Sequence, residues 1–283
     1  MSRRLPWALL AVLVLAQICY PLTDGPARAR LTVATVVLGY LLSVGHALLS
    51  RGPRGAAALV AVATGGGFAI EAVGVATGVP FGSYDYSGEL GPKLAGVPLI
   101  IPLAWTWMAW PAWLAAVRLT TPGRTGAPAR GRLVVRRVAL AAVGLAAWDL
   151  FLDPQMVDEG YWRWRDATGA LPGLPGVPVS NYLGWLLFAV LLMSALRPLA
   201  GPAVAVTDGR DAPMLALYLW TYGSSVLAHA VFLDLPASAL WGAAGMGVTA
   251  VPLAVVLLLR ALRHREDRRE PRRAQRPGVD ATT

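Results

Sequence analysis

Apolar stretches of about 20 residues recur along the whole of this chain, and they restrict its possible folds more than any other feature. A helix needs about 20 apolar residues to cross the hydrocarbon core of a bilayer. Only 14% of the 283 residues are charged, whereas soluble domains carry roughly 25%. The sequence therefore predicts an all-α fold, a polytopic transmembrane helical bundle. We expect one transmembrane domain at residues 1–262 and a basic, disordered cytoplasmic tail at 263–283.

Eight spans are expected from the hydropathy pattern, with boundaries uncertain by several residues. The first resembles a signal peptide, but the apolar segments that follow favour a retained helix. The expected spans are 5–23, 31–50, 56–79, 97–119, 133–153, 181–199, 213–234 and 237–261.

Arginine is concentrated in alternate connections, which predicts the orientation of the bundle. The connection at 118–137 and the tail are rich in arginine, whereas the loop between the third and fourth spans carries only Lys93. Because basic loops stay in the cytoplasm, we expect an integral protein of a bacterial-type cell membrane with both termini inside. The net charge of +9 then reflects orientation beside membrane lipid, and no nucleic-acid partner is expected.

With this orientation, the ionisable residues inside the spans gather at one depth. Glu71 lies in the outer half of the third span, Asp149 and Asp153 near the outer end of the fifth, and His229 toward the outer end of the seventh. Only His46 falls nearer the inner end. Charged residues inside a bilayer are costly and usually mark a functional site.

The two aspartates are four residues apart, so they share one helix face. Two adjacent carboxylates repel each other in a low-dielectric site, so one of them is expected to keep its proton and to serve as a general acid. Alternatively, Asp153 caps the turn at Pro154 outside the membrane core and only Asp149 is buried. Glu71, among glycines that allow close approach, belongs either to the site or to a structural hydrogen bond between helices.

Two segments that lie 80 residues apart echo each other, LAGVPLIIPLAW at 94–105 and LPGVPVSNYLGW at 174–185. Each follows a helix that carries an acid and then an acidic, aromatic loop. The pattern indicates an internal parallel repeat of spans three and four with spans five and six. Parallel repeats place substrate sites at their interface.

The loop after the third span, FGSYDYSGELGPKLAGVP, contains Tyr84, Asp85, Tyr86 and Lys93. These residues form either an aromatic belt at the membrane interface or the mouth of a site in which Lys93 pairs with an acid. His229 is more typical of a structural histidine than of a site residue.

Metal-binding, phosphate-binding and serine-hydrolase motifs are absent from the sequence, so no metal and no cofactor are expected. The acidic and aromatic residues described above suit acid-catalysed chemistry on a hydrocarbon dissolved in the membrane. A protonated carboxyl would protonate an isolated alkene, aromatic faces and carboxylates would stabilise the tertiary cation, and water would capture it.

The motifs AIEAVGVATGVPFGSYDYSGELGPKLAGVPLIIPLAW, WDLFLDPQMVDEGYWRW and GVPVSNYLGW resemble the CruF-type carotenoid hydratases, whose relatives include the bisanhydrobacterioruberin hydratases. The resemblance covers roughly residues 65–235. It implies addition of water to the terminal double bond of an acyclic carotenoid, with a tertiary alcohol as product. The substrate class comes from the resemblance alone.

The candidate residues follow from these motifs. The candidate catalytic acids are Glu71, Asp85, Asp149 and Asp153. The candidate substrate-binding residues are aromatic or polar: Tyr84, Tyr86, Lys93, Trp105, Trp148, Tyr161, Trp162, Asn181 and His229. Three alternatives stay open: a carotenoid cyclase with a dry site, a carotenoid-binding protein without chemistry, and a proton-coupled transporter. The oligomeric state is not predicted.

Overall fold

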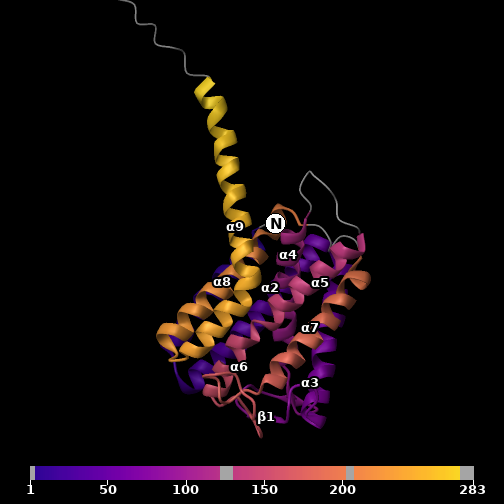
Figure 1. The fold of residues 1–283 in the computed structure, drawn as a ribbon, viewed down its shortest axis with the longest axis vertical. Coiled ribbons are helices and arrows are strands. Elements are labelled where there is room, and N and C mark those ends of the chain that lie inside the picture. The colour runs from indigo at the N-terminus through magenta and orange to yellow at the C-terminus, as the bar shows by residue number, and fades with distance from the viewer. Residues whose placement is uncertain (1–3, 122–129, 202–206, 275–283) are drawn as a thin grey trace, which may run out of the picture.

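The computed structural model describes residues 4–121, 130–201 and 207–274, and its helices run back and forth between the two ends of one bundle (Figure 1). The elements in chain order are α1 (Leu5–Cys19), η1 (Tyr20–Leu22), α2 (Gly25–Leu59), η2 (Val60–Gly65), α3 (Gly66–Thr77), β1 (Tyr84–Tyr86), β2 (Lys93–Leu94), β3 (Val97–Pro98), α4 (Ile101–Thr120), α5 (Arg130–Ala146), α6 (Asp149–Asp158), β4 (Trp162–Trp164), α7 (Val179–Ala200), η4 (Gly209–Asp211), α8 (Ala212–Leu227), η5 (Ala228–Phe232) and α9 (Pro236–Ala274).

The helical content confirms the predicted all-α membrane bundle, and each of the eight predicted spans falls on a helical pass. Within the described ranges, five helical segments are long and apolar enough to cross a membrane. They are Leu5–Leu22, Gly25–Thr77, Val179–Ala200, Gly209–Phe232 and Pro236–Arg263. The second has 53 residues, which is enough for two crossings. Gly52, at φ 78°, breaks it just before Pro53.

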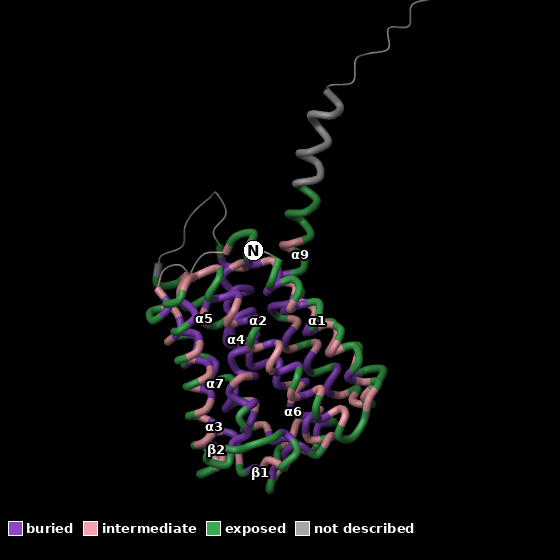
Figure 2. Tube along the Cα trace, turned by 180° about the vertical axis from the view of Figure 1, so that it is seen from behind, coloured by how far each residue is buried: buried purple, intermediate pink, exposed green. Residues whose placement is uncertain are grey.

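The predicted spans at 97–119 and 133–153 are not among these five. The helix α5 has only 17 residues, and α4 holds the interior of the bundle. The helix α4 is buried along almost its whole length and packs against α2, α3, α5, α8 and α9. Its tryptophans lower its hydropathy, yet they fill the core. A helix that is buried on all sides is expected at the centre of a bundle, and buried residues occupy the interior in Figure 2.

The fifth predicted span is not one continuous helix, which corrects the expectation for 133–153. The helix α5 ends at Ala146 and α6 begins at Asp149. Pro154, inside α6, has no N–H group to donate to the carbonyl of Leu150. The Ser238 hydroxyl donates to that carbonyl instead, at 2.7 Å, so a side chain from α9 completes the hydrogen bonding of α6.

Close contacts through small residues hold the helices together, as in many membrane bundles. A Cβ atom at Gly39 of α2 would lie 2.5 Å from the ring of Trp107, so only glycine permits this approach of α2 to α4. The Ser43 hydroxyl donates to the Trp107 carbonyl one turn further along, at 2.8 Å.

A polar cluster ties α2 to the start of α8 at the end of the bundle where the chain begins. Arg51 donates to both carboxylate oxygens of Asp211 at 2.8 Å. His46 accepts from Trp110 at 2.9 Å, and its other ring nitrogen lies 3.0 Å from the carbonyl of Arg210. His46 therefore belongs to a structural cluster at this end of the bundle.

The helix α9 continues to Ala274, past the predicted boundary at 262. The part of the expected disordered tail at 263–274 is therefore helical, and residues 275–283 lie outside the described ranges. Arginine and glutamate, which dominate this segment, are strong helix formers.

The orientation of the bundle in the membrane remains a prediction, and the arrangement of the helical passes provides a test of it. The strand β1 lies at the opposite end of the bundle from the N-terminus (Figure 1). We expect a fluorescent protein fused to the C-terminus to fluoresce in the cytoplasm. Alkaline phosphatase inserted after Ser87, just beyond β1, is expected to be active outside the membrane. An active phosphatase at the C-terminus, with an inactive insertion after Ser87, would invert the topology.

Candidate functional site

Two short strands form a lid over the end of the bundle that contains β1. The strand β1 contacts α3 and β4 contacts α6, and the two pair with Tyr84 opposite Trp164 and Tyr86 opposite Trp162. Side chains alternate between the two faces of a strand. The four aromatic side chains therefore point into the bundle, and Asp85 points away from it.

Asp85 is consequently separated from the other acids, contrary to the expectation that it joins them. Its carboxylate is about half exposed and forms two hydrogen bonds with Arg165 at 2.7 and 2.8 Å. The Arg165 guanidinium holds the pKa of Asp85 below its usual value. Lys93 is also exposed, and it donates to the backbone carbonyl of Tyr86 rather than to an acid. Both residues fix the lid from outside.

Glu71 lies beneath the lid and is 4% exposed. Its Oε2 accepts hydrogen bonds from the hydroxyls of Tyr84 at 2.7 Å and Tyr86 at 2.8 Å. Its Oε1 accepts from the indole of Trp105 at 3.0 Å. An ionised carboxylate only accepts hydrogen bonds, whereas a protonated one must also donate. Three donors around Glu71 therefore suit its ionised form.

Asp149 and Asp153 form a second acidic group, with Asn181 of α7 between them. The Asn181 amide nitrogen donates to both carboxyls, to Asp149 at 2.7 Å and to Asp153 through a short hydrogen bond. Asp153 also accepts from the indole of Trp162 at 3.1 Å. Both aspartates are at most 3% exposed, so the alternative in which Asp153 caps a turn outside the core is wrong. Within the described part of the chain, the Asp149 Oδ1 atom is buried with no hydrogen-bond partner.

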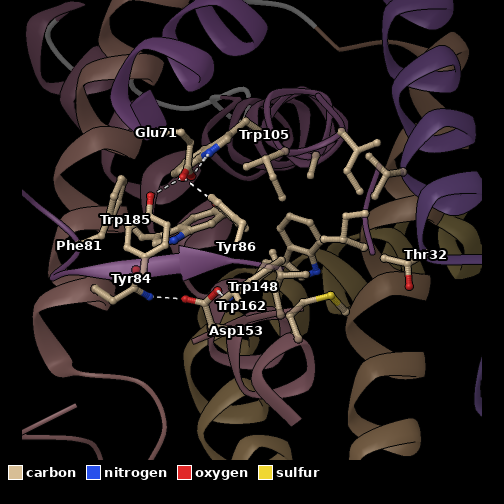
Figure 3. Close-up of a pocket in the computed structure, with 18 of the residues that line it drawn as sticks. Thr32, Glu71, Phe81, Tyr84, Tyr86, Trp105, Trp148, Asp153, Trp162 and Trp185 are labelled. Carbon is tan, nitrogen blue, oxygen red and sulfur yellow. Dashed lines mark hydrogen bonds between the residues drawn. The ribbon is translucent and has the colours of Figure 1, made fainter. Parts of the chain in front are cut away.

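An aromatic cavity separates Glu71 from the aspartate pair (Figure 3). Asp153 lines this cavity and Asp149 lies behind it. Trp105 and Trp185 stack with ring centroids 3.7 Å apart, and Trp148 lies edge-on to Trp185. The free volume is about 50 Å³, room for a few water molecules, so a larger ligand requires side chains to move.

The structure brings together most of the predicted site residues and leaves several apart. The predicted residues that line the cavity are Glu71, Tyr84, Tyr86, Trp105, Trp148, Asp153, Trp162 and Asn181. Besides Asp149, the predicted residues outside its lining are Asp85, Lys93, Tyr161 and His229. Tyr161 is buried next to the lid, and His229 lines a neighbouring cavity.

Four aromatic residues of the cavity were not among the predicted site residues, namely Phe81, Trp107, Trp164 and Trp185. Two of them had a signal in the sequence. Trp164 is two residues from Trp162, so it shares the inward face of a strand. Trp185 occupies the position in the second echo segment that Trp105 occupies in the first, and the two rings stack at the meeting point of the segments.

No group of three histidine, cysteine or acidic side chains is placed to hold a metal ion within the described ranges. The expectation that the protein uses neither metal nor cofactor stays a prediction. The chemistry that the cavity itself offers is a proton held by the aspartate pair, a carboxylate at Glu71 and the faces of several aromatic rings.

The packing of the lid predicts a specific effect of a methyl group at Gly74 of α3. A Cβ atom there would lie 2.8 Å from the Tyr84 hydroxyl and 2.8 Å from the Phe81 ring. Gly74→Ala therefore displaces a donor of Glu71, and overpacking of this kind costs about 1–3 kcal/mol. We expect a lower midpoint of thermal unfolding, followed by tryptophan fluorescence in detergent.

The matched control is Gly45→Ala in α2, where no atom of the described residues lies within 4 Å of the added Cβ. Alanine favours a helix over glycine by about 1 kcal/mol, so this variant is expected to keep or raise the midpoint. Equal losses in both variants would contradict the packing described for Gly74.

Comparison with known proteins places these observations in a family. A bisanhydrobacterioruberin hydratase from Haloarcula japonica is 40% identical over 129 residues, which cover 44% of this chain and 40% of the relative. The match thus spans less than half of the length of that relative. No solved structure matches the chain. The model of the family described as carotenoid biosynthesis protein matches residues 31–260, and the chain belongs to this family.

Proposed function

We propose that this protein is a carotenoid hydratase that adds water across the terminal double bond of an acyclic carotenoid. Membership of the carotenoid biosynthesis family and the similarity to a hydratase support the substrate class and the reaction. One observation carries the mechanism: Asp153 lines an aromatic cavity and is backed by a second buried carboxyl, Asp149.

The aspartate pair supplies the proton. Two neighbouring carboxylates in a buried site do not both ionise, so the pair retains one proton. Of the two, Asp153 faces the cavity, so the proton leaves through it to the less substituted carbon of the alkene. Asp149 and Asn181 are positioning residues that keep the shared proton at this place.

Glu71 stabilises the tertiary cation that this proton transfer creates. Its three hydrogen-bond donors, Tyr84, Tyr86 and Trp105, hold it in the ionised form on the wall of the same cavity. Fixed charges in a site that excludes water stabilise developing charge strongly. The faces of the indole and phenol rings add cation–π stabilisation of about 0.5–2 kcal/mol each.

Water completes the reaction without a cofactor. Its oxygen forms a bond with the tertiary carbon, and one of its protons returns to the aspartate pair. The alkene has then gained one hydrogen and one hydroxyl group, and the acid is regenerated. Asp153, which lines the cavity, accepts the returning proton for the pair.

The alternatives make different demands on the same cavity. A cyclase needs the cation to meet an internal alkene before water, and a binding protein needs no acid. A transporter needs proton-coupled flux. The buried acids between aromatic walls favour cation chemistry over the last two, and the fate of the cation separates hydratase from cyclase.

Substitutions of the acids test the proposal. We expect Asp153→Asn to lower the rate by roughly 10²–10⁴-fold, the usual contribution of a general acid. Glu71→Gln, which removes the stabilising charge, is expected to cost roughly 10²–10³-fold. The measurement is mass spectrometry of pigments from cells that accumulate lycopene or bisanhydrobacterioruberin. The wild-type product is heavier than the substrate by one water molecule.

Asp85→Asn is the matched control, because Asp85 lies on the outward face of the lid. We expect it to retain activity within a few-fold of the wild type. Loss of product in Asp85→Asn with normal product in Asp153→Asn would contradict the assignment. A cyclic product of unchanged mass would establish the cyclase instead.

A further inference from the structure

A second cavity adjoins the aromatic cavity between α1, α2, α6 and α8, and we call it the polar chamber. Its volume is about 110 Å³. Six residues line both cavities and form the partition between them: Thr32, Val36, Trp107, Trp148, Leu152 and Met156. Figure 3 shows Thr32 on the far side of the aromatic cavity from Glu71 and Asp153.

Half of the residues that line the polar chamber carry a polar side chain, which is unusual inside an apolar bundle. They are Gln17, Tyr20, Thr32, Thr35, Gln155, Thr221, Ser224, Ser225 and His229. Two of their hydroxyls, those of Tyr20 and Thr221, are buried and have no hydrogen-bond partner within the described ranges. The Tyr20 hydroxyl faces Gln155 and Thr32, but neither meets it at hydrogen-bond geometry.

Other side chains keep the chamber wall in place. The Ser238 hydroxyl donates to the Leu150 carbonyl, so it accepts a hydrogen bond from His229 Nδ1 at 2.9 Å. The second ring nitrogen of His229, Nε2, is then an acceptor and lies 3.1 Å from the side-chain amide of Gln155. This network connects the wall of the polar chamber to the Leu150 carbonyl of α6, the helix that also carries Asp153.

The composition of this wall identifies the occupant. A buried hydroxyl without a partner costs free energy, and water is the small molecule that satisfies several such groups at once. A water molecule needs about 10–15 Å³ of such volume, so the polar chamber has room for several. A polyene has no donors or acceptors and would leave the hydroxyls of Tyr20 and Thr221 unsatisfied.

We propose that the polar chamber holds the water that captures the cation, and that Tyr20, Thr32 and Thr221 are its binding groups. This inference rests on the proposed function. Thr32 donates to the Arg28 carbonyl at 3.0 Å, so its oxygen can act as a hydrogen-bond acceptor for a water molecule at the partition. The side chains of Leu152, Met156 and Trp148 separate this water from the acids until the cation forms. The positive charge then attracts the water into the aromatic cavity.

The test compares two fates of the same cation in D₂O, with lycopene in vesicles as the probe. A cation that meets water gives a hydrated product with one deuterium on carbon. A cation that loses a proton instead returns an unhydrated carotenoid that carries deuterium. We expect Tyr20→Phe and Thr221→Val to lower the ratio of hydrated to deuterated, unhydrated product roughly tenfold, the effect of one lost hydrogen bond.

The matched control is Tyr222→Phe in α8, which removes a hydroxyl that bonds the Ala243 carbonyl and leaves the ratio unchanged. The ratio comes from one enzyme sample, so a smaller folded fraction does not alter it. If both products fall together in the chamber variants, or if neither changes, the polar chamber does not hold the reacting water. A rise in lycopene consumption would assign the chamber to the polyene and overturn the proposal. A wild-type protein that forms neither product, with lycopene or with bisanhydrobacterioruberin, would overturn the proposed function itself.

Discussion

The burial of three carboxyl groups inside an apolar bundle is the constraint on which the rest of the structure depends. Each charge placed in a membrane interior costs at least about 2.5–3.5 kcal/mol on insertion scales. The chain offsets this cost with donors from separate segments: two tyrosines from β1, an indole each from α4 and β4, and an amide from α7. The lid, the central helix and α7 must therefore all be in place before the acids are satisfied.

The same constraint explains the division of roles between the acids. In the proposed mechanism, Glu71 is surrounded by donors and is a fixed anion, whereas the aspartate pair shares one amide and keeps a proton. A proton donor and an anion on the walls of one aromatic cavity are the two parts that alkene protonation needs. The polar chamber adds the third part, a supply of water that is separated from the acids by apolar side chains.

Much of the architecture could be predicted from the sequence, because it follows from hydropathy and from the placement of charges. The eight passes and the gathering of Glu71, Asp149 and Asp153 at one end of the bundle are examples. The break between α5 and α6 could not be predicted, because hydropathy shows no interruption at Trp148. The helical continuation of α9 was missed because a charged segment was interpreted as disordered.

The errors within the site have a common physical origin. Asp85 belongs to the same motif as Tyr84 and Tyr86, but a motif does not show which way its side chains point. Once the segment is a strand, alternation turns Asp85 outward. Whether Asp149 or Asp153 faces the cavity, and the presence of a polar chamber around His229, depend on how α6 is rotated about its axis within the bundle. The sequence alone does not specify that rotation.

The central claim is that the aspartate pair holds the reactive proton while Glu71 is ionised. Infrared spectroscopy of the protein in membranes at neutral pH tests it most directly, because a protonated carboxylic acid has a carbonyl-stretching band that shifts in D₂O. The account predicts that Asp153→Asn and Asp149→Asn each remove or displace this band and that Glu71→Gln retains it. A band that disappears in Glu71→Gln and persists in both aspartate variants would contradict the account.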